Sequence, residues 1–420
     1  MPRASSRTSS TLTIFVTLGL TSLGVACGDD TSGTGGGGEG GAGSTTSSAG
    51  GNGSGTGGDA TGGAGGGTGG SGGIGPFVPG APIDAPDETW TWIDFPDSRC
   101  INDTPTGIGI NKTTASENVA IFLMGGNACF NGVSCQITAN TNGYGSGKFA
   151  SEGVLDAPLF DRTDPLNPLR DYSYVFVPYC TGDVHAGNRE GVVVGGTERN
   201  FHGFKNMRAF LQRIVPTFPN ADTVVLAGVS AGGFGAAFNY VHVSEAFGDD
   251  TNVVLVDDSG PPMSSEFISP CLQKHFSDTW GLASTFPEDC TACDNAEGVF
   301  IEPYIDHVIS TYPTRSLAVI SSDADSTIRA FWSYGQNDCS SINGLPGDYP
   351  AAQYRAGLED MRDRIGAGTN RFRLYMPTST KHVWLGEDIT TVDAAGGKNL
   401  AEWLEEAISG DPGWANASTP

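Results

Sequence analysis

From residue 76 onward, short runs of apolar residues alternate with longer stretches in which apolar and polar residues are mixed. Five of these runs are nearly continuous in Val, Ile, Leu and Phe, which is the pattern of strands buried on both faces of a parallel sheet. A sixth, more polar run lies near the C-terminus. We therefore predict strands at residues 119–124, 174–178, 223–227, 252–257, 316–320 and 371–376.

The stretches between the runs have apolar residues at helical spacing. We predict helices at residues 204–218, 232–247, 354–365 and 399–408. Strands that alternate with helices, without a repeat period, indicate one α/β domain over residues 76–420. The expected fold is a doubly wound, mostly parallel sheet with helices on both faces. Functional residues of such sheets lie on loops at the carboxyl ends of the strands.

Residues 261–315 interrupt this alternation, because they carry several Cys and Pro residues and no clear strand. We interpret them as a cap or lid-like insertion. The alternative is that they are an irregular part of the domain itself.

Composition separates the first 75 residues from the rest of the 420-residue chain. Residues 28–75 contain 25 of the 62 glycines, and most of the others are Ser, Thr and Ala. Such a segment has too little apolar surface to fold, so it is predicted to be a disordered linker. Residues 1–27 have the order of an export signal: Arg3 and Arg7 precede a short apolar stretch.

The signal ends in Ala26-Cys27, which resembles a bacterial lipoprotein processing site. We expect Cys27 to become a lipid anchor, and the linker to separate that anchor from the domain. The protein would then be exported from a bacterial cytoplasm and held in the periplasm or on the cell surface. The alternative is an ordinary signal peptide that is cleaved nearby, with Cys27 incidental.

Eight further cysteines lie in the domain, an even number that favours disulfides in an exported protein. Cys129 and Cys135 are close enough in sequence to close a small loop. Cys290 and Cys293 have the spacing of a redox or zinc pair, but no second such pair or paired His accompanies them. We therefore predict structural disulfides, and neither a metal nor another cofactor. The eight are Cys100, Cys129, Cys135, Cys180, Cys271, Cys290, Cys293 and Cys339.

The charge balance limits the partners of the domain. The chain has 47 acidic and 22 basic residues, and only four of the acids and two of the arginines precede residue 76. An acidic domain is poorly suited to bind nucleic acid or an anionic membrane surface, because both require clustered cations. We expect contact with a membrane only through the lipid anchor, and a monomer.

The strand predicted at 223–227 leads directly into Gly228-Val-Ser-Ala-Gly-Gly233. This is the G-x-S-x-G pattern between a strand and a helix, where a tight turn exposes the serine hydroxyl. The following helix directs its N-terminus at the serine and stabilises negative charge there. We interpret Ser230 as a nucleophile. The alternative is a glycine-rich turn in which Ser230 only caps the helix.

A nucleophilic serine needs a base and an acid, which follow it in the chain order of α/β-hydrolases. His382 follows the last predicted strand after a short loop, so we predict that it is the base. The acid should follow the strand at 316–320, where both Asp323 and Asp325 occur. Spacing alone does not decide between these two carboxylates.

Acyl transfer also requires backbone N–H groups that bind the developing oxyanion. One donor should be Ala231, directly after the nucleophile. A second is expected from the loop at 125–129, where two glycines allow close approach of the backbone to a substrate. The alternative for this loop is a plain Gly-Gly turn.

Five segments then occur in one order: residues 125–135, 177–187, 228–233, 325–328 and His382. Together they resemble the pectin acetylesterase family of Notum-like serine esterases, over about residues 90–408. The resemblance implies an α/β-hydrolase-like fold and a serine carboxylesterase that removes acyl groups.

Residue by residue, the resemblance implies Ser230 as nucleophile, His382 as base and Asp325 as acid. It implies oxyanion donors at Gly126, Asn127 and Ala231. The loop with Asp183, His185 and Gly187 matches a family loop near the site. Asn127 stands where the family usually has Trp, which keeps a backbone donor but removes an aromatic pocket wall.

The sequence therefore predicts an exported serine carboxylic-ester hydrolase whose substrate is an acylated polysaccharide or another ester. Removal of acetyl groups from a polysaccharide is the leading hypothesis. The alternatives are a lipase or polyester hydrolase of the same fold, or a non-catalytic surface protein that uses the fold for binding.

Overall fold

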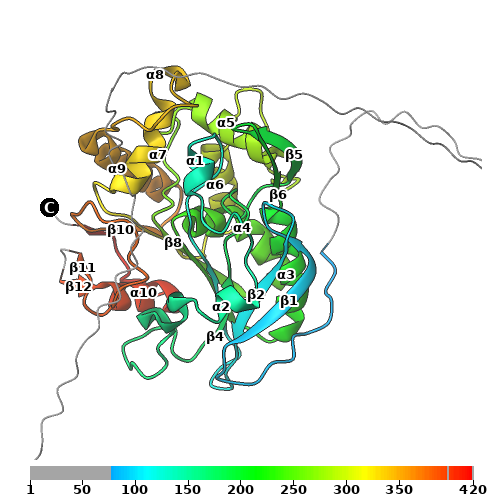
Figure 1. Ribbon diagram of the computed structural model, residues 1–420. Coiled ribbons are helices and arrows are strands. Elements are labelled where there is room, and N and C mark those ends of the chain that lie inside the picture. Colours follow the sequence, from blue (N-terminus) through cyan, green and yellow to red (C-terminus); the bar gives the residue numbers. More distant parts are fainter. Residues whose placement is uncertain (1–76, 395–396, 419–420) are drawn as a thin grey trace, which may run out of the picture. The chain divides into compact units, whose positions relative to one another are not determined.

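A nine-stranded sheet forms the centre of the domain in the computed structural model, which describes residues 77–394 and 397–418 (Figure 1). The predicted signal, the Cys27 anchor and the linker at 28–75 lie outside the described residues. Along the sheet the strands are β1 (Thr91–Arg99), β2 (Pro105–Asn111), β4 (Ser173–Val177), β3 (Val119–Leu123), β7 (Thr223–Val229), β8 (Asn252–Asp258), β9 (Leu317–Ile320), β10 (Phe372–Met376) and β13 (Ala417–Ser418).

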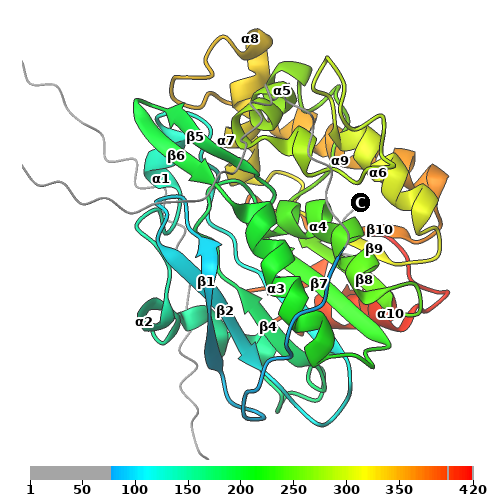
Figure 2. The same ribbon diagram turned by 90° about the vertical axis from the view of Figure 1, so that its right-hand side faces the viewer.

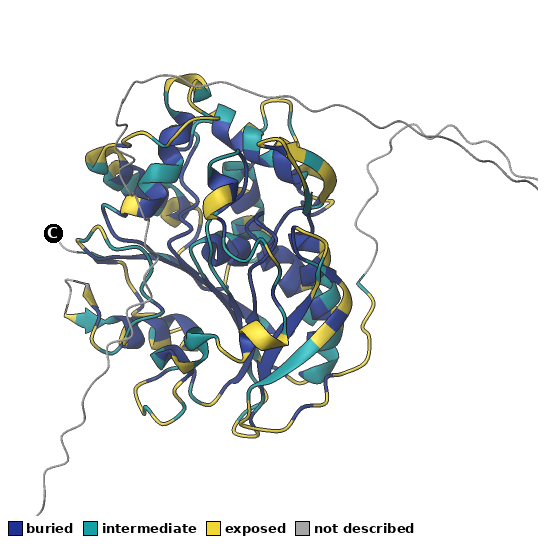
Figure 3. Cartoon of the chain, in the orientation of Figure 1, coloured by how far each residue is buried: buried dark blue, intermediate teal, exposed yellow. Residues whose placement is uncertain are grey.

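Most neighbouring strands are parallel. Only β2 runs against its neighbours, because it pairs antiparallel with both β1 and β4. All six predicted strands are present, with ends within two residues of the predicted ones. The five central runs are buried along nearly their whole length, as expected for strands covered on both faces (Figure 3).

The four predicted helices correspond to α3 (Gly203–Thr217), α4 (Ala231–Phe247), α9 (Ala351–Gly368) and α10 (Leu400–Ser409). Side chains of α3, α4 and α9 share one apolar core with one set of strand residues, and α10 shares a second core with the alternate residues of the same strands. α3 and α4 cover one face of the sheet, and α10 lies against the other (Figure 2). The doubly wound fold is therefore confirmed.

Residues 261–315 contain two further helices, α5 (Pro270–Trp280) and α6 (Ile301–Thr311), joined by largely irregular segments. Both contribute side chains to the core that contains α3 and α4. The other α-helices are α7 (Ser326–Trp332) and the short α1 (Ser134–Ile137), α2 (Ser146–Phe149) and α8 (Gln336–Cys339). The described residues also form two small hairpins, β5 (Arg189–Val194) with β6 (Thr197–Phe201) and β11 (Asp393–Ala394) with β12 (Lys398–Asn399), and short 3-10 helices at Gly153–Asp156, Pro158–Phe160, Leu282–Ser284 and Ser333–Gly335.

Four disulfides join the eight cysteines of the domain. The predicted bond between Cys129 and Cys135 is present, and the Cys290–Cys293 pair also forms a disulfide. The other two join distant parts of the chain, Cys100–Cys180 and Cys271–Cys339. This number of disulfides is typical of proteins outside the reducing cytosol. Among the described residues, no helix combines the length and the apolar character that a membrane crossing requires.

Candidate active site

Ser230 lies in a sharp turn between the end of β7 and the start of α4. Its backbone has φ 57° and ψ −122°, a conformation that is costly for any residue with a side chain. The flanking glycines are required by space. A Cβ atom on Gly228 would lie 2.0 Å from the carbonyl oxygen of Gly232, and one on Gly232 would lie 2.0 Å from that of Leu123. The turn therefore depends on small residues on both sides of Ser230.

The Ser230 side chain does not cap α4, because its oxygen accepts no hydrogen bond from the first turn of the helix. This geometry contradicts the capping alternative. The Ser230 N–H instead donates to the carbonyl oxygen of Asp258 at the end of β8, over 2.7 Å. The hydroxyl is therefore left at the N-terminus of a 17-residue helix, where the helix dipole is positive.

Asp325, and not Asp323, contacts the imidazole of His382. Oδ2 of Asp325 lies 2.7 Å from Nδ1 of His382. Oδ1 of Asp325 accepts the N–H groups of Thr327 and Ile328 at the start of α7, over 2.9 and 3.0 Å. Asp325 is fully buried, so these bonds fix its orientation.

Asp323 has a different set of partners. Its Oδ1 accepts the N–H of Ser379, and its Oδ2 forms an ion pair with Arg355, both over 3.0 Å. The two carboxylates that spacing alone left equivalent are thus distinct in the structure: one holds the imidazole, and the other holds the loop before it.

The other imidazole nitrogen of His382, Nε2, is buried and has no hydrogen-bond partner among the described residues. No hydrogen bond joins it to the Ser230 hydroxyl, a common finding for such pairs without bound substrate. The loop that carries His382 is held by β8, since the N–H groups of Trp384 and Leu385 both donate to the Asp258 carboxylate.

The loop at 125–129 approaches the nucleophile closely. A Cβ atom on Gly125 would lie 2.6 Å from the carbonyl oxygen of Val229 and 3.0 Å from Cβ of Ser230. Gly126 and Asn127 both have positive φ, 154° and 65°. The Asn127 side chain donates to the carbonyl oxygen of Ile137, over 2.9 Å, and so points along its own loop. The Cys129–Cys135 bond closes this loop, whose Asn127 borders the same pocket as Ser230 and Ala231.

The family-like loop around Asp183 and His185 packs behind the loop at 125–129. Nε2 of His185 lies 2.9 Å from the carbonyl oxygen of Met124, and the imidazole packs at a tilt against the ring of Tyr179. Burial lowers the pKa of His185 to about 4, so the neutral ring donates Nε2–H to this carbonyl. Asp183 is fully buried and accepts the N–H of Gly203. Gly187 packs against Asp183, where a Cβ atom would lie 2.5 Å from its Oδ2.

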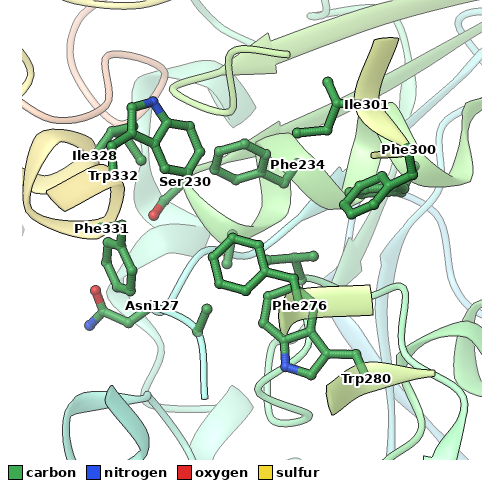
Figure 4. Close-up of a pocket in the computed structure, with 14 residues that line it drawn as sticks. Asn127, Ser230, Phe234, Phe276, Trp280, Phe300, Ile301, Ile328, Phe331 and Trp332 are labelled. Atoms are coloured by element: carbon green, nitrogen blue, oxygen red, sulfur yellow. The ribbon is translucent and has the colours of Figure 1, made fainter. Parts of the chain in front are cut away.

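An apolar pocket opens beside Ser230 (Figure 4). Its enclosed volume, taken as the space open to the centres of water-sized molecules, is about 50 Å³. Apart from Asn127 and Ser230, its lining is aliphatic or aromatic. The walls come from α4, from the loops at 125–129 and 177–187, and from the segments 276–301 and 328–332. They comprise Ala128, Val184, Ala231, Phe234, Phe238, Phe276, Trp280, Phe300, Ile301, Ile328, Phe331 and Trp332.

Sequence reasoning missed this aromatic wall. Phe234 and Phe238 lie on α4, which was predicted. The other aromatic wall residues lie in the insertion at 261–315, where no helix was predicted, and on α7 directly after Asp325. The available signal was the density of Phe and Trp in these segments, which a motif search does not register.

A comparison with family models matches residues 91–330, more than half of the chain, to the model described as Pectinacetylesterase. The chain belongs to the pectinacetylesterase family. The match includes the segments around Gly126, Ser230 and Asp325, and it ends before His382. Membership is consistent with the resemblance on which the sequence interpretation relied.

Similar proteins are named as carboxylesterases. The chain is 29% identical over 134 residues to the palmitoleoyl-protein carboxylesterase NOTUM of Schmidtea mediterranea, covering 31% of this chain and 25% of that protein. It is 28% identical over 172 residues to notum1a of Danio rerio, covering 38% and 33%. The aligned part thus spans between a quarter and a third of these relatives.

The fold of this family member is also found in a solved relative. The crystal structure of the Wnt deacylase Notum from Drosophila superposes with a TM-score of 0.55 at 18% identity, covering 76% of this chain and 94% of that one. At this identity the likeness concerns the fold: a mostly parallel sheet flanked by helices.

Proposed function

We propose that this protein is a serine carboxylesterase with Ser230 as nucleophile, His382 as base and Asp325 as the acid that orients it. The observation that carries the proposal is the 2.7 Å contact between His382 and the buried Asp325. The loop that carries His382 is bound by the end of β8, which also binds the Ser230 turn. Membership in the pectinacetylesterase family supports it.

The mechanism follows from the hydrogen-bonding capacity of each group. Asp325 accepts Nδ1–H of His382, which leaves the lone pair of the buried Nε2 to take the Ser230 proton. The serine oxygen then attacks the ester carbonyl, and His382 returns the proton to the leaving alcohol. Water hydrolyses the acyl-enzyme by the same steps. Backbone N–H groups at Gly126, Asn127 and Ala231, with the positive end of α4, stabilise the oxyanion.

We propose further that the acyl group is larger than acetyl and apolar. Each buried methylene contributes about 0.8 kcal/mol, which corresponds to about a fourfold change in an equilibrium or rate ratio. An acetyl group has a single methyl to bury, whereas the aromatic walls of the pocket can cover a longer chain. This favours the lipase-like alternative for the acyl part of the substrate.

The second candidate is deacetylation of a polysaccharide, which the description of the matching family favours. The two candidates differ in chain-length preference. On p-nitrophenyl esters, the first predicts a kcat/KM at least tenfold higher for butyrate and octanoate than for acetate. The second predicts a preference for acetate, together with acetate release from acetylated pectin or xylan.

The catalytic proposal itself is tested by Ser230→Ala in the full-length protein. We expect complete loss of ester hydrolysis and of labelling by a fluorophosphonate probe, with an unchanged circular dichroism spectrum. Full activity of this variant would overturn the proposal. Absence of labelling in the folded wild-type protein would favour a non-catalytic binding protein.

We also propose that the protein is exported and lipid-anchored at Cys27. The four disulfides of the domain support export. The anchor is tested by labelling expressing cells with a radioactive fatty acid. Label on the wild-type protein but not on Cys27→Ser is the expected result, and equal labelling of both would contradict an anchor at this residue.

A further inference from the structure

Asp258, the last residue of β8, binds the loop that carries His382. Its Oδ2 accepts two consecutive backbone N–H groups, those of Trp384 at 2.5 Å and Leu385 at 2.7 Å. Its Oδ1 accepts the hydroxyl of Ser259 at 3.0 Å, and that hydroxyl oxygen accepts the N–H of Val383 at 3.2 Å. The three N–H groups that follow His382 are therefore held by Asp258, directly or through Ser259.

The main chain of Asp258 holds the nucleophile as well. Its carbonyl oxygen accepts the Ser230 N–H over 2.7 Å. The next residue, Ser259, donates its own N–H to the carbonyl oxygen of Ile320 at the end of β9, also over 2.7 Å. β8 lies between β7, which leads to Ser230, and β9, which leads to Asp325. Asp258 thus binds the Ser230 turn and the His382 loop directly. Its neighbour Ser259 binds the end of β9, which leads to Asp325.

The His382 loop requires such support, because it does not adopt a relaxed conformation. Val383 has φ 61°, which is a strained position for a β-branched residue. The N–H groups held by Asp258 are those of this strained residue and of the two that follow it. A shift of about 1 Å at a reacting group can cost about 100-fold in rate, so loosening here should be visible in catalysis.

We propose that Asp258 is a positioning residue, whose carboxylate holds His382 in register with the Ser230 turn that its own carbonyl fixes. This inference rests on the proposed function. Burial raises the pKa of Asp258 to about 6, while the two N–H donors and the nearby His382 lower it and so stabilise the ionised carboxylate. The neighbouring Asp257 does not act in this way: its Oδ1 accepts only the N–H of Gly260, and it has no bond to the His382 loop.

The test compares Asp258→Ala and Asp258→Asn with Asp257→Asn, a control that is equally buried at the same strand end. In Asp258→Ala the N–H groups of Trp384 and Leu385 lose their acceptor, and we expect kcat to fall about 100-fold with KM changed less than threefold. Asp258→Asn keeps a carbonyl acceptor, so its kcat should be about tenfold higher than that of Asp258→Ala. Asp257→Asn should keep kcat within threefold of wild type. Thermal unfolding of each variant verifies that it is folded.

The outcomes distinguish failure of the positioning role from failure of the proposed esterase function. If Ser230→Ala abolishes activity but Asp258→Ala keeps kcat within threefold of wild type, the positioning role is wrong and the serine esterase proposal stands. A loss in Asp257→Asn equal to that in Asp258→Asn would also overturn the role, because it would show a general effect of burial. If Ser230→Ala and Asp258→Ala both keep full activity, the proposed function is wrong, and the positioning role that rests on it is wrong as well.

Discussion

At the scale of single residues, the candidate site depends on which atoms each carboxylate faces. Asp323 and Asp325 lie two positions apart on one loop, and spacing did not distinguish them. The resemblance to the family favoured Asp325, and the structure has the imidazole contact at Asp325 while Asp323 binds Ser379 and Arg355. Such a choice depends on side-chain direction after a turn, which no pattern of residue types encodes.

The first residue-scale prediction concerns these two carboxylates. Asp325→Asn should lower kcat/KM by about 10⁴-fold, because an amide in this position favours the wrong imidazole tautomer. Asp323→Asn loses an ion pair with a partly exposed Arg355 and should lower kcat/KM less than tenfold. Steady-state kinetics on one p-nitrophenyl ester measure both. A larger loss in Asp323→Asn would reverse the roles proposed for the two residues.

A second residue-scale prediction concerns the stability of the folded protein at acid pH. Burial lowers the pKa of both His185 and His242 to about 4, below the value of about 6.5 expected in the unfolded chain. The stability from each neutral ring is therefore complete above pH 6.5 and is lost as the pH falls through 4. It amounts to about 3 kcal/mol per ring.

Chemical denaturation between pH 7 and pH 4 measures this effect. Asp258 acts in the opposite direction, because its pKa is raised, so each variant is compared with wild type at every pH. His185→Gln keeps an N–H donor for the carbonyl oxygen of Met124, and His242→Gln keeps one for that of Thr285. Each variant should show a smaller fall of the unfolding free energy between pH 7 and pH 4. An unchanged slope in both variants would refute the assignment.

At the scale of elements, what could be predicted follows from burial. The central strands have apolar side chains on both faces and were recognised from their composition alone. β1, at the edge of the sheet, and β2, beside it, were missed because they mix polar residues and glycine with apolar ones. α5 and α6 were missed because the cysteines and prolines around them resemble an irregular region. α5 and α7 supply much of the pocket wall, so the pocket could not be anticipated from the motifs.

The disulfides allow a prediction at this scale. Cys271–Cys339 joins α5 to the end of α8 across 68 positions, whereas Cys290–Cys293 spans three. Loop-closure entropy in the unfolded chain gives about 4 kcal/mol for the first and about 2 kcal/mol for the second. We expect the double variant Cys271→Ser/Cys339→Ser to lose about twice as much unfolding free energy in urea as Cys290→Ser/Cys293→Ser. Equal losses would mean that local packing, rather than chain entropy, dominates.

At the scale of the whole molecule, the acid excess belongs to the domain. Residues 76–420 contain 43 acidic and 20 basic side chains. Such a domain repels anionic polymers, and salt screens this repulsion. Raising the ionic strength from 10 to 300 mM should increase kcat/KM severalfold on acetylated, demethylated pectin and leave it within twofold on a neutral p-nitrophenyl ester. A decrease on pectin would instead indicate a local cationic binding surface.

Helix α7 carries both the proposed triad acid and part of the pocket wall. Asp325 is its N-cap, and Ile328, Phe331 and Trp332 from the same seven-residue helix line the pocket. α5, in contrast, supplies Phe276 and Trp280 and no member of the proposed triad. For a protein engineer, the two walls are therefore unequal starting points. If the proposed function holds, libraries built on α5 should vary the accepted acyl chain at constant turnover, whereas those on α7 should also move the carboxylate proposed to orient the base.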